Sequence, residues 1–171
     1  MSISAFRIGH GFDVHPLVAG RRLVLGGVVV PHDKGLAGHS DADVLLHAVA
    51  DAFLGAVAGG DIGQWFPDSQ EQYRDADSRQ LLEQIIHSPR HQAWHLVNLD
   101  CTIMAEQPRL AIHVPAIRHS IASLFAADPE QISVKATTCE KLGFVGREEG
   151  IAVSAVVLLS RTEYRGNNIR Q

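Results

Sequence analysis

The chain has 171 residues and a formal net charge of −4, with 46% hydrophobic and 20% charged residues. This length suits one packed domain, and this composition excludes a largely disordered or collagen-like protein. The acidic balance disfavours a nucleic-acid binder, and no stretch forms a signal peptide or reaches the roughly 20 apolar residues of a membrane span, so we expect a cytoplasmic protein that binds neither nucleic acid nor membrane.

The first thirty residues are β-rich. Residues 5–15, AFRIGHGFDVH, alternate loosely between polar and apolar side chains. Residues 21–31, RRLVLGGVVVP, place two short apolar runs on either side of Gly26 and Gly27. The alternation predicts a strand, and the interrupted run predicts a second strand or a hairpin.

A helix is predicted within residues 38–60, GHSDADVLLHAVADAFLGAVAGG. Ser40 or Asp41 is a good N-cap, acidic residues follow in the first turn, and a Gly-Gly pair ends the pattern. Apolar residues recur every three or four positions, which leaves His47 and Asp51 stacked on a second, polar side of the helix.

The rest of the chain alternates between helices and strands. A loop over residues 60–77, long enough to favour a functional role, leads to a helix over residues 77–88 that is capped by Asp77 or Ser78. The pattern then predicts a strand over 94–105, a helical segment over 110–127 apart from Pro115, and strands over 132–138 and 151–160. This alternation predicts an α/β or α+β fold.

Histidine is the residue type to examine for a site. The two cysteines, Cys101 and Cys139, are far apart in the sequence, which signals neither a disulfide framework nor a thiolate zinc site. The chain has ten histidines, and several of them stand beside acidic residues.

Asp13 and His15 lie two residues apart on the first predicted strand, so their side chains share one face. With His47 from the predicted helix they offer three nitrogen and oxygen ligands and leave a fourth position open, which is typical of a catalytic zinc site. The spacing also allows a structural interpretation, in which His47 bonds Asp51 or a backbone carbonyl and Asp13 caps a turn.

Residues 38–43, GHSDAD, have the chemistry of anion recognition. The backbone N–H groups at the start of a helix favour an anion, and His39 and Ser40 add donors beside them. On the residues alone, an ordinary N-cap with solvated acids in the first turn is the simpler explanation.

The loop segment GDIGQWFPD, residues 60–68, is more elaborate than a plain surface turn requires. Asp61 and Asp68 bracket Gly63, and glycine lets the backbone come close to a ligand. The Phe66-Pro67 pair stiffens the end of this segment.

A last segment whose side chains could bind a ligand is VKATTCEKLGFVGREEG, residues 134–150. Thr137 and Thr138 can donate to phosphate oxygens, and Glu140 is an oxygen ligand suited to Mg²⁺ held partly by substrate phosphates. Taken alone, a glutamate such as Glu140 is more often a solvated surface charge.

These segments occur together in one family. The runs RIGHGFDVH, GLAGHSDADVLLHAVADAFLGA, GDIGQWFPD, DSRQLL and VKATTCEKLGFVGREEGIA resemble, in order and spacing, the 2-C-methyl-D-erythritol 2,4-cyclodiphosphate synthases. The resemblance runs from Arg7 to about Leu159 and favours the metal site over the structural interpretation.

The resemblance implies a fold, an assembly and a reaction. The fold is a single α+β domain over residues 1–171, with a mixed four-stranded sheet packed against helices and a flexible tail at about 161–171. The assembly is a homotrimer with its sheets around the threefold axis and its active sites between neighbouring subunits. The reaction closes 4-diphosphocytidyl-2-C-methylerythritol 2-phosphate into the cyclic diphosphate and releases CMP, in the methylerythritol phosphate route to isoprenoids.

The resemblance also assigns roles to residues. Asp13, His15 and His47 match the ligands of Zn²⁺, and Glu140 matches the ligand of Mg²⁺ or Mn²⁺ held with the substrate diphosphate. His39 and Thr138 match residues that stabilise the transition state. The positions that match contacts to the substrate and its cytidine diphosphate group are Ser40, Asp61, Ile62, Gly63, Phe66, Pro67, Asp68, Ser69, Gln70, Ala105, Glu106, Gln107, Pro108, Arg109, Thr137, Phe144 and Arg147. A cavity on the threefold axis, where family members hold isoprenoid diphosphates, is matched by Phe12, Phe144 and Arg147.

Two other functions fit the same residues. A zinc-dependent phosphohydrolase would use the cluster to activate water and would form a linear product. A non-catalytic trimeric module would bind a nucleotide or metal without turnover, which the complete set of metal-ligand candidates disfavours. Cys139, Trp65 and Gln70 depart from the family pattern, and they bear on loop closure rather than on the proposed ligands.

Overall fold

The computed structural model describes residues 5–67 and 69–161. Its strands are β1 (Ala5–Ala19), β2 (Leu23–Leu25), β3 (Val28–Val30), β4 (Lys34–Leu36), β5 (Trp94–Met104), β6 (Ile132–Thr137) and β7 (Gly150–Arg161). Its helices are α1 (Val44–Val57), α2 (Ile62–Trp65), α3 (Ser78–Ile86), α4 (Val114–Leu124) and α5 (Gly143–Gly146), with 3-10 turns η1 (Glu71–Tyr73) and η2 (Pro129–Gln131). Asp68 and, apart from Arg161, the predicted tail lie outside the described residues. Within the described part of the chain, no helix is long and apolar enough to cross a membrane.

Five strands form one mixed sheet in the order β4-β1-β7-β5-β6. β1 pairs antiparallel with β4 and β7, whereas β5 pairs antiparallel with β7 and parallel with β6. The predicted count of four strands is wrong by one, because β4 adds to the edge of β1 opposite Leu17–Ala19. This strand has three residues, Lys34–Leu36, and no apolar run that would reveal it in the sequence.

The predicted hairpin is present as a separate two-stranded sheet formed by β2 and β3. Gly26 and Gly27 connect its strands with φ angles of 63° and 74°. Both angles lie in the left-handed region that a two-residue hairpin turn requires, which explains the Gly-Gly pair between the two apolar runs.

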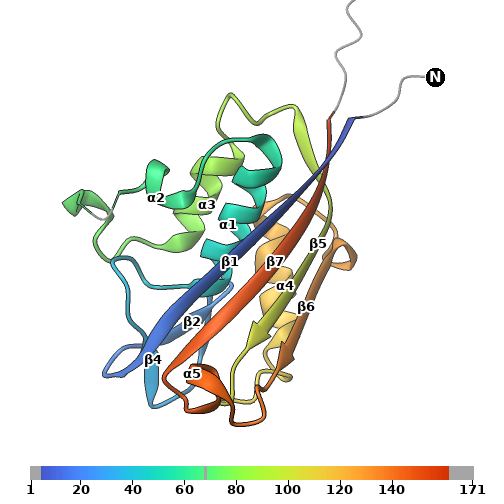
Figure 1. The fold of residues 1–171 in the computed structure, drawn as a ribbon. Coiled ribbons are helices and arrows are strands. Elements are labelled where there is room, and N and C mark those ends of the chain that lie inside the picture. Colours follow the sequence, from blue (N-terminus) through green and yellow to red (C-terminus); the bar gives the residue numbers. More distant parts are fainter. Residues whose placement is uncertain (1–4, 68, 162–171) are drawn as a thin grey trace, which may run out of the picture.

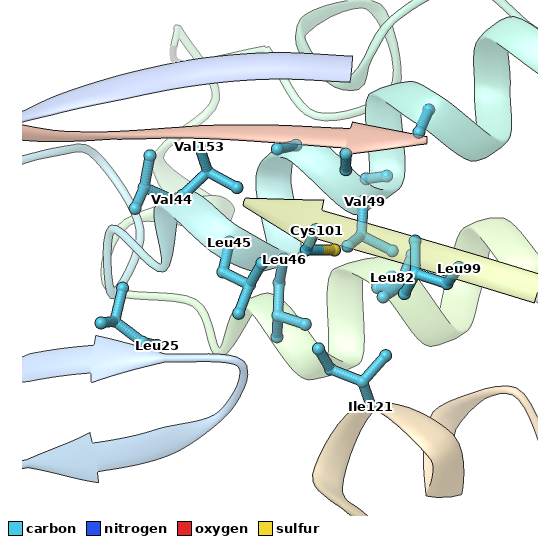
Figure 2. Close-up of a cluster of buried hydrophobic side chains, with 14 of the residues drawn as sticks. Leu25, Val44, Leu45, Leu46, Val49, Leu82, Leu99, Cys101, Ile121 and Val153 are labelled. Carbon is cyan, nitrogen blue, oxygen red and sulfur yellow. The ribbon is translucent and has the colours of Figure 1, made fainter. Parts of the chain in front are cut away.

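Helices α1, α3 and α4 cover one face of the sheet (Figure 1). Figure 2 shows Leu45, Leu46 and Val49 of α1 beside Leu99 of β5 and Val153 of β7, and all five side chains are buried. Burying side chains of this size contributes roughly 1.5–3 kcal/mol each relative to exposure. This layer therefore holds α1 firmly against the sheet.

Helix α1 begins later than the sequence predicts. Its N-cap is Asp43, not Ser40 or Asp41, and the Asp43 carboxylate accepts from the N–H groups of the second and third helical residues at 3.1 and 3.0 Å. The same buried carboxylate accepts from both glycines of the β2–β3 turn at 2.9 and 2.6 Å. Asp43 is therefore the capping residue because it joins the helix to the hairpin, and the other acids precede the helix.

The opposite face of the sheet carries exposed apolar side chains. Phe6, Ile8, Phe12 and Val14 of β1 have exposed fractions of 61%, 72%, 54% and 44%. Strand alternation places them on the face away from α1. A large exposed apolar surface of this kind is typical of a face that another molecule covers.

Candidate functional site

Strand β1 and helix α1 lie in close contact beside the site. A Cβ atom added at Gly9 would lie 1.8 Å from the carbonyl oxygen of Ala52, and one added at Gly11 would lie 2.0 Å from that of Ala48. Glycine is therefore required at both positions for the helix backbone to rest on the strand. Alternation along β1 places Asp13 on the same face, near the start of the helix.

Asp13, His15 and His47 meet at this point. Asp13 Oδ2 lies 2.9 Å from His15 Nε2 and 3.2 Å from His47 Nδ1, and these two nitrogens are 3.2 Å apart. Ligand atoms at tetrahedral zinc stand about 3.3–3.6 Å from one another, given metal–ligand distances of about 2.0–2.2 Å. The donor set and its spacing therefore fit a zinc ion with little movement.

Interactions within the cluster shift the pKa values of two of its members. Burial favours the neutral form of Asp13, but the close contacts of its carboxylate with the imidazoles of His15 and His47, and the charge of these histidines, outweigh burial and hold the pKa of Asp13 well below its usual range. Burial also disfavours the charged form of His15, but its hydrogen bonds to Asp13 and the Ala37 carbonyl raise its pKa. A bound cation would replace the proton that His15 gains in the metal-free protein.

Each histidine has its second ring nitrogen engaged away from the cluster. His15 Nδ1 lies 2.7 Å from the carbonyl oxygen of Ala37. His47 Nε2 lies 3.1 Å from Ser40 Oγ and 3.0 Å from Ser78 Oγ. Such contacts orient metal-binding imidazoles and determine which nitrogen faces the ion.

The cluster opens into a cavity of about 250 Å³. Its lining includes the predicted catalytic residue His39 and the predicted substrate contacts Ser40, Ile62, Gly63 and Phe66. Asp51, to which the sequence assigned no substrate role, also lines the cavity. Its carboxylate accepts from the N–H of Ile62 at 2.8 Å and so fastens the loop to α1, whereas the structural interpretation offered Asp51 as one of two possible partners for His47.

The other described contacts predicted in the 60–70 loop lie outside this lining. Asp61 caps α2 by accepting from the N–H of Gln64 at 2.9 Å. Pro67 is half-buried, whereas Ser69 and Gln70 are exposed, and the Gln70 carbonyl oxygen lies 3.4 Å from His39 Nε2. These residues shape the edge of the loop.

Trp65, one of the departures from the family pattern, has a structural role in the same loop. Its indole N–H donates to the Gly59 carbonyl at 2.9 Å. Its ring centroid lies 5.4 Å from that of the buried His91 and 6.4 Å from that of Phe66. Trp65 thus anchors α2 beside the end of α1.

Two backbone N–H groups at the start of α1 are already engaged within the chain. The Asp43 carboxylate accepts from both of them. GHSDAD therefore contains an N-cap, and the capping residue is Asp43. His39 and Ser40 contribute to the cavity by their side chains instead.

A second cavity, of about 450 Å³, lies beside β6. Its lining includes the predicted contacts Ala105, Glu106, Pro108, Arg109 and Thr137 and the predicted catalytic residue Thr138, but not Gln107. The Glu106 carboxylate accepts from the N–H groups of Cys139 and Lys141, both at 3.0 Å. It thereby shapes the turn in which the Thr138 hydroxyl donates to Glu140 at 3.0 Å.

The two cavities belong to different parts of the sheet. β7 and β5 separate β1 from β6, so the two strands stand about 14 Å apart at a spacing of about 4.8 Å per strand. Among the described residues, the metal-ligand cluster consists of Asp13, His15 and His47 without Glu140. Within one chain, the predicted metal ligands therefore do not all lie at one place.

The residues predicted for a threefold cavity are accessible in the single chain. Phe12 has an exposed fraction of 54% and Phe144 of 40%. The guanidinium of Arg147 donates to both carboxylate oxygens of Glu149, at 2.9 and 3.0 Å. These side chains offer apolar surface and a paired cation to a partner or ligand.

Comparisons with known proteins place the chain in a family. The YgbB family model matches residues 6–160. The curated relatives named 2-C-methyl-D-erythritol 2,4-cyclodiphosphate synthase include that of Geobacillus sp. (strain WCH70), which is 60% identical over 91% of this chain and 99% of the relative. They also include that of Geobacter sulfurreducens, which is 58% identical over 90% of this chain and 98% of the relative.

Solved structures agree with the sequence comparison. The bifunctional IspDF from Campylobacter jejuni is 42% identical, with a TM-score of 0.89, over 94% of this chain and 43% of that chain. IspF from Plasmodium falciparum, solved as a CDP complex, is 30% identical, with a TM-score of 0.82, over 95% of this chain and 100% of that chain. The chain therefore belongs to the YgbB family, and the curated relatives that it matches bear the name 2-C-methyl-D-erythritol 2,4-cyclodiphosphate synthase.

Proposed function

We propose that the chain converts 4-diphosphocytidyl-2-C-methyl-D-erythritol 2-phosphate into 2-C-methyl-D-erythritol 2,4-cyclodiphosphate and releases CMP, in the methylerythritol phosphate route to isoprenoids. In this reaction an oxygen of the 2-phosphate bonds to the β-phosphorus while the bond from that phosphorus to CMP breaks. The proposal is carried by the convergence of Asp13, His15 and His47 on a cavity, in a chain 60% identical to a relative with the synthase name.

The donor sets determine which ions the chain would hold. One carboxylate oxygen and two imidazole nitrogens with an open position suit Zn²⁺, so we assign zinc to Asp13, His15 and His47. Glu140 is an oxygen ligand suited to Mg²⁺ or Mn²⁺ held partly by substrate phosphates. When bound, the two ions would supply charge neutralisation for the phosphates and the leaving CMP.

The side chains around the cavities position the reactants. A phosphate is already anionic near neutral pH, so positioning and charge stabilisation matter more than a strong general base. The ring N–H of His39 and the hydroxyl of Thr138 are donors suited to oxygens that gain charge during the transfer. The loop that Asp51 fastens through Ile62 would enclose the methylerythritol group and limit its movement.

A complete site requires more than one copy of the chain in this proposal. The zinc cluster and the cavity that contains Ala105–Arg109 are separated by two strands within one chain. The exposed apolar face of β1 supports a homotrimer with its sheets around a threefold axis, in which one subunit supplies the zinc cluster and its neighbour the cytidine pocket. In that trimer, Phe12, Phe144 and Arg147 would line an axial cavity suited to an isoprenoid diphosphate.

Phosphorus NMR tests the reaction. Purified protein is incubated with the substrate, Zn²⁺ and Mg²⁺, and compared with the variants His47→Ala and His119→Ala. His119 is an exposed histidine on α4 whose Nδ1 bonds the Pro115 carbonyl, away from both cavities. We expect the cyclic diphosphate and equimolar CMP from the wild type and His119→Ala, and neither product from His47→Ala.

The same spectra decide between the alternatives. A linear phosphate product with CMP would favour the zinc-dependent phosphohydrolase. A folded, metal-loaded protein that binds CDP without turning over the substrate would favour the non-catalytic binding module.

A further inference from the structure

Ser78 occupies a position at the proposed metal centre to which neither the sequence nor the proposed reaction gives a chemical task. It is the first residue of α3, which Asp77 caps by accepting from the N–H of Arg79. Only 1% of Ser78 is exposed, and its Oγ lies 3.0 Å from His47 Nε2. The hydroxyl therefore faces the outer edge of a proposed zinc ligand.

The position of the hydroxyl proton follows from the partners of Ser78. Its Oγ donates to Asp41 Oδ1 at 2.5 Å, and its backbone N–H donates to Asp41 Oδ2 at 3.2 Å. A serine hydroxyl has one proton, and a carboxylate can only accept. With that proton directed to Asp41, Ser78 Oγ acts toward His47 as an acceptor.

The acceptor role of Ser78 determines the tautomer of His47. The ring proton must lie on Nε2, which leaves the lone pair of Nδ1 directed at Asp13 and His15. Ser40 is compatible with this assignment, because its Oγ, 3.1 Å from Nε2, can share the same proton. Nδ1 is the atom that the proposed zinc site needs without a proton.

We propose that Ser78, oriented by Asp41, is a positioning residue that keeps His47 in the tautomer required for metal binding. Without the Ser78 hydroxyl, Nε2 would keep only the contact with Ser40 Oγ, which already accepts from the N–H of Ala42 at 3.1 Å. The Asp13 carboxylate, whose Oδ2 is 3.2 Å from His47 Nδ1, would then draw the ring proton to that nitrogen. The proton would then occupy the atom that must bind the ion. His15 has no such dependence on a side chain, because its outer nitrogen bonds the Ala37 carbonyl. The metal-binding part of this proposal rests on the proposed zinc site.

Nitrogen NMR of metal-free protein with ¹⁵N-labelled histidine tests the tautomer directly. At about pH 8 an ordinary imidazole is neutral, and the chemical shifts of its two nitrogens show which one carries the proton. We expect His47 of the wild type to carry its proton on Nε2 and to shift toward the Nδ1-protonated form in Ser78→Ala. A wild-type His47 protonated on Nδ1 would overturn the proposal, and this measurement needs neither a variant nor a metal.

Zinc affinity tests the consequence, by competition with a chromophoric chelator. Removing the outer partner of a metal-binding histidine typically weakens binding by 10–100-fold, and we expect a loss in that range for Ser78→Ala. The matched control is Asp77→Ala, which loses the cap of the same helix but no contact with His47, and we expect its affinity to stay within about threefold of the wild type.

Two outcomes of the affinity measurement would overturn the proposal. One is wild-type affinity in Ser78→Ala. The other is an equal loss in both variants, because the placement of α3 alone would then explain it. A wild type that binds no zinc would instead overturn the proposed metal centre, and the tautomer measurement in the metal-free protein would still decide the role of Ser78.

Discussion

Replacing Gly11 by alanine should push α1 away from β1. The new Cβ would lie 2.0 Å from the carbonyl oxygen of Ala48 and 2.7 Å from the backbone nitrogen of Ala52. An ordinary carbon–oxygen contact is about 3.3 Å, so the helix must retreat by roughly 1.3 Å. Overpacking of this kind typically costs about 1–3 kcal/mol. Here the contacted backbone atoms cannot rotate away, so we expect the free energy of unfolding to fall by about 3 kcal/mol.

The same movement should damage the metal centre. His47 lies on α1, while Asp13 and His15 lie on β1, and their ligand atoms are 2.9–3.2 Å apart. Metal–ligand distances tolerate changes of only about 0.2 Å, and a misplacement of about 1 Å can cost on the order of 100-fold in rate. We expect zinc affinity and turnover both to fall at least about tenfold.

Urea unfolding of the metal-free protein measures the stability loss, and chelator competition measures zinc affinity. Gly55→Ala is the matched control, because it lies on the same helix and its Cβ would have its nearest neighbour, the His10 carbonyl oxygen, at an ordinary 3.8 Å. We expect the free energy of unfolding of this control to rise by about 0.5–1 kcal/mol and its zinc affinity to equal that of the wild type. Wild-type stability and zinc affinity in Gly11→Ala would mean that the contact between strand and helix does not constrain the metal centre.

Three further predictions concern the cap of α1, the turn beside the second cavity and the cluster itself. Asp43→Ala leaves four backbone N–H groups without their acceptor, so urea unfolding should show a loss of about 3 kcal/mol, and a loss below about 1 kcal/mol would contradict this. Glu106→Ala frees the N–H groups that shape the turn of Thr138; we expect kcat to fall at least about tenfold with zinc affinity unchanged, and a parallel loss of zinc affinity would contradict the assignment. The folded pKa of His15 is raised, so its pair with Asp13 should stabilise the metal-free protein fully below about pH 6.5 and cease to do so as the pH rises through the folded pKa. The stability difference between wild type and His15→Ala should therefore be larger at about pH 5.5 than at about pH 9, and a difference that grows with pH would contradict the sign.

Local patterns were sufficient to predict several elements of the fold. The two glycines between apolar runs predict the β2–β3 hairpin, and Asp77 before an amphipathic run predicts the start of α3. The cap of α1 was misassigned because Asp43 is distinguished by a tertiary contact with the hairpin turn, which helix patterns do not contain. Strand β4 was missed because three residues at an edge have no periodicity of their own.

The site residues also divide into those that local sequence patterns predict and those that depend on tertiary contacts. Strand spacing alone places Asp13 and His15 on one face, but spacing could not decide between His47 as a third ligand and His47 as a partner of Asp51. The close approach of α1 to β1 brings His47 beside Asp13 and His15, whereas Asp51 accepts from the N–H of Ile62. Ser78 could be noted only as a helix cap, because its contact with His47 spans 31 positions in the sequence.

Glu106 shows why a contact assigned by resemblance needs coordinates. Its position matches a substrate contact, yet its carboxylate accepts from two backbone N–H groups of the turn after β6. The side chain therefore organises Thr138 and Glu140, and this role depends on a β5–β6 pairing that no local pattern reveals.

A crystal structure of the protein with Zn²⁺ and CDP, with diffraction data collected at the zinc absorption edge, would test the proposed site most stringently. We expect an anomalous peak bounded by Asp13, His15 and His47 of one subunit, and cytidine in the pocket of Ala105–Arg109 of its neighbour. Zinc bound elsewhere, or a single chain that supplies both the zinc cluster and the cytidine pocket, would contradict the proposed site.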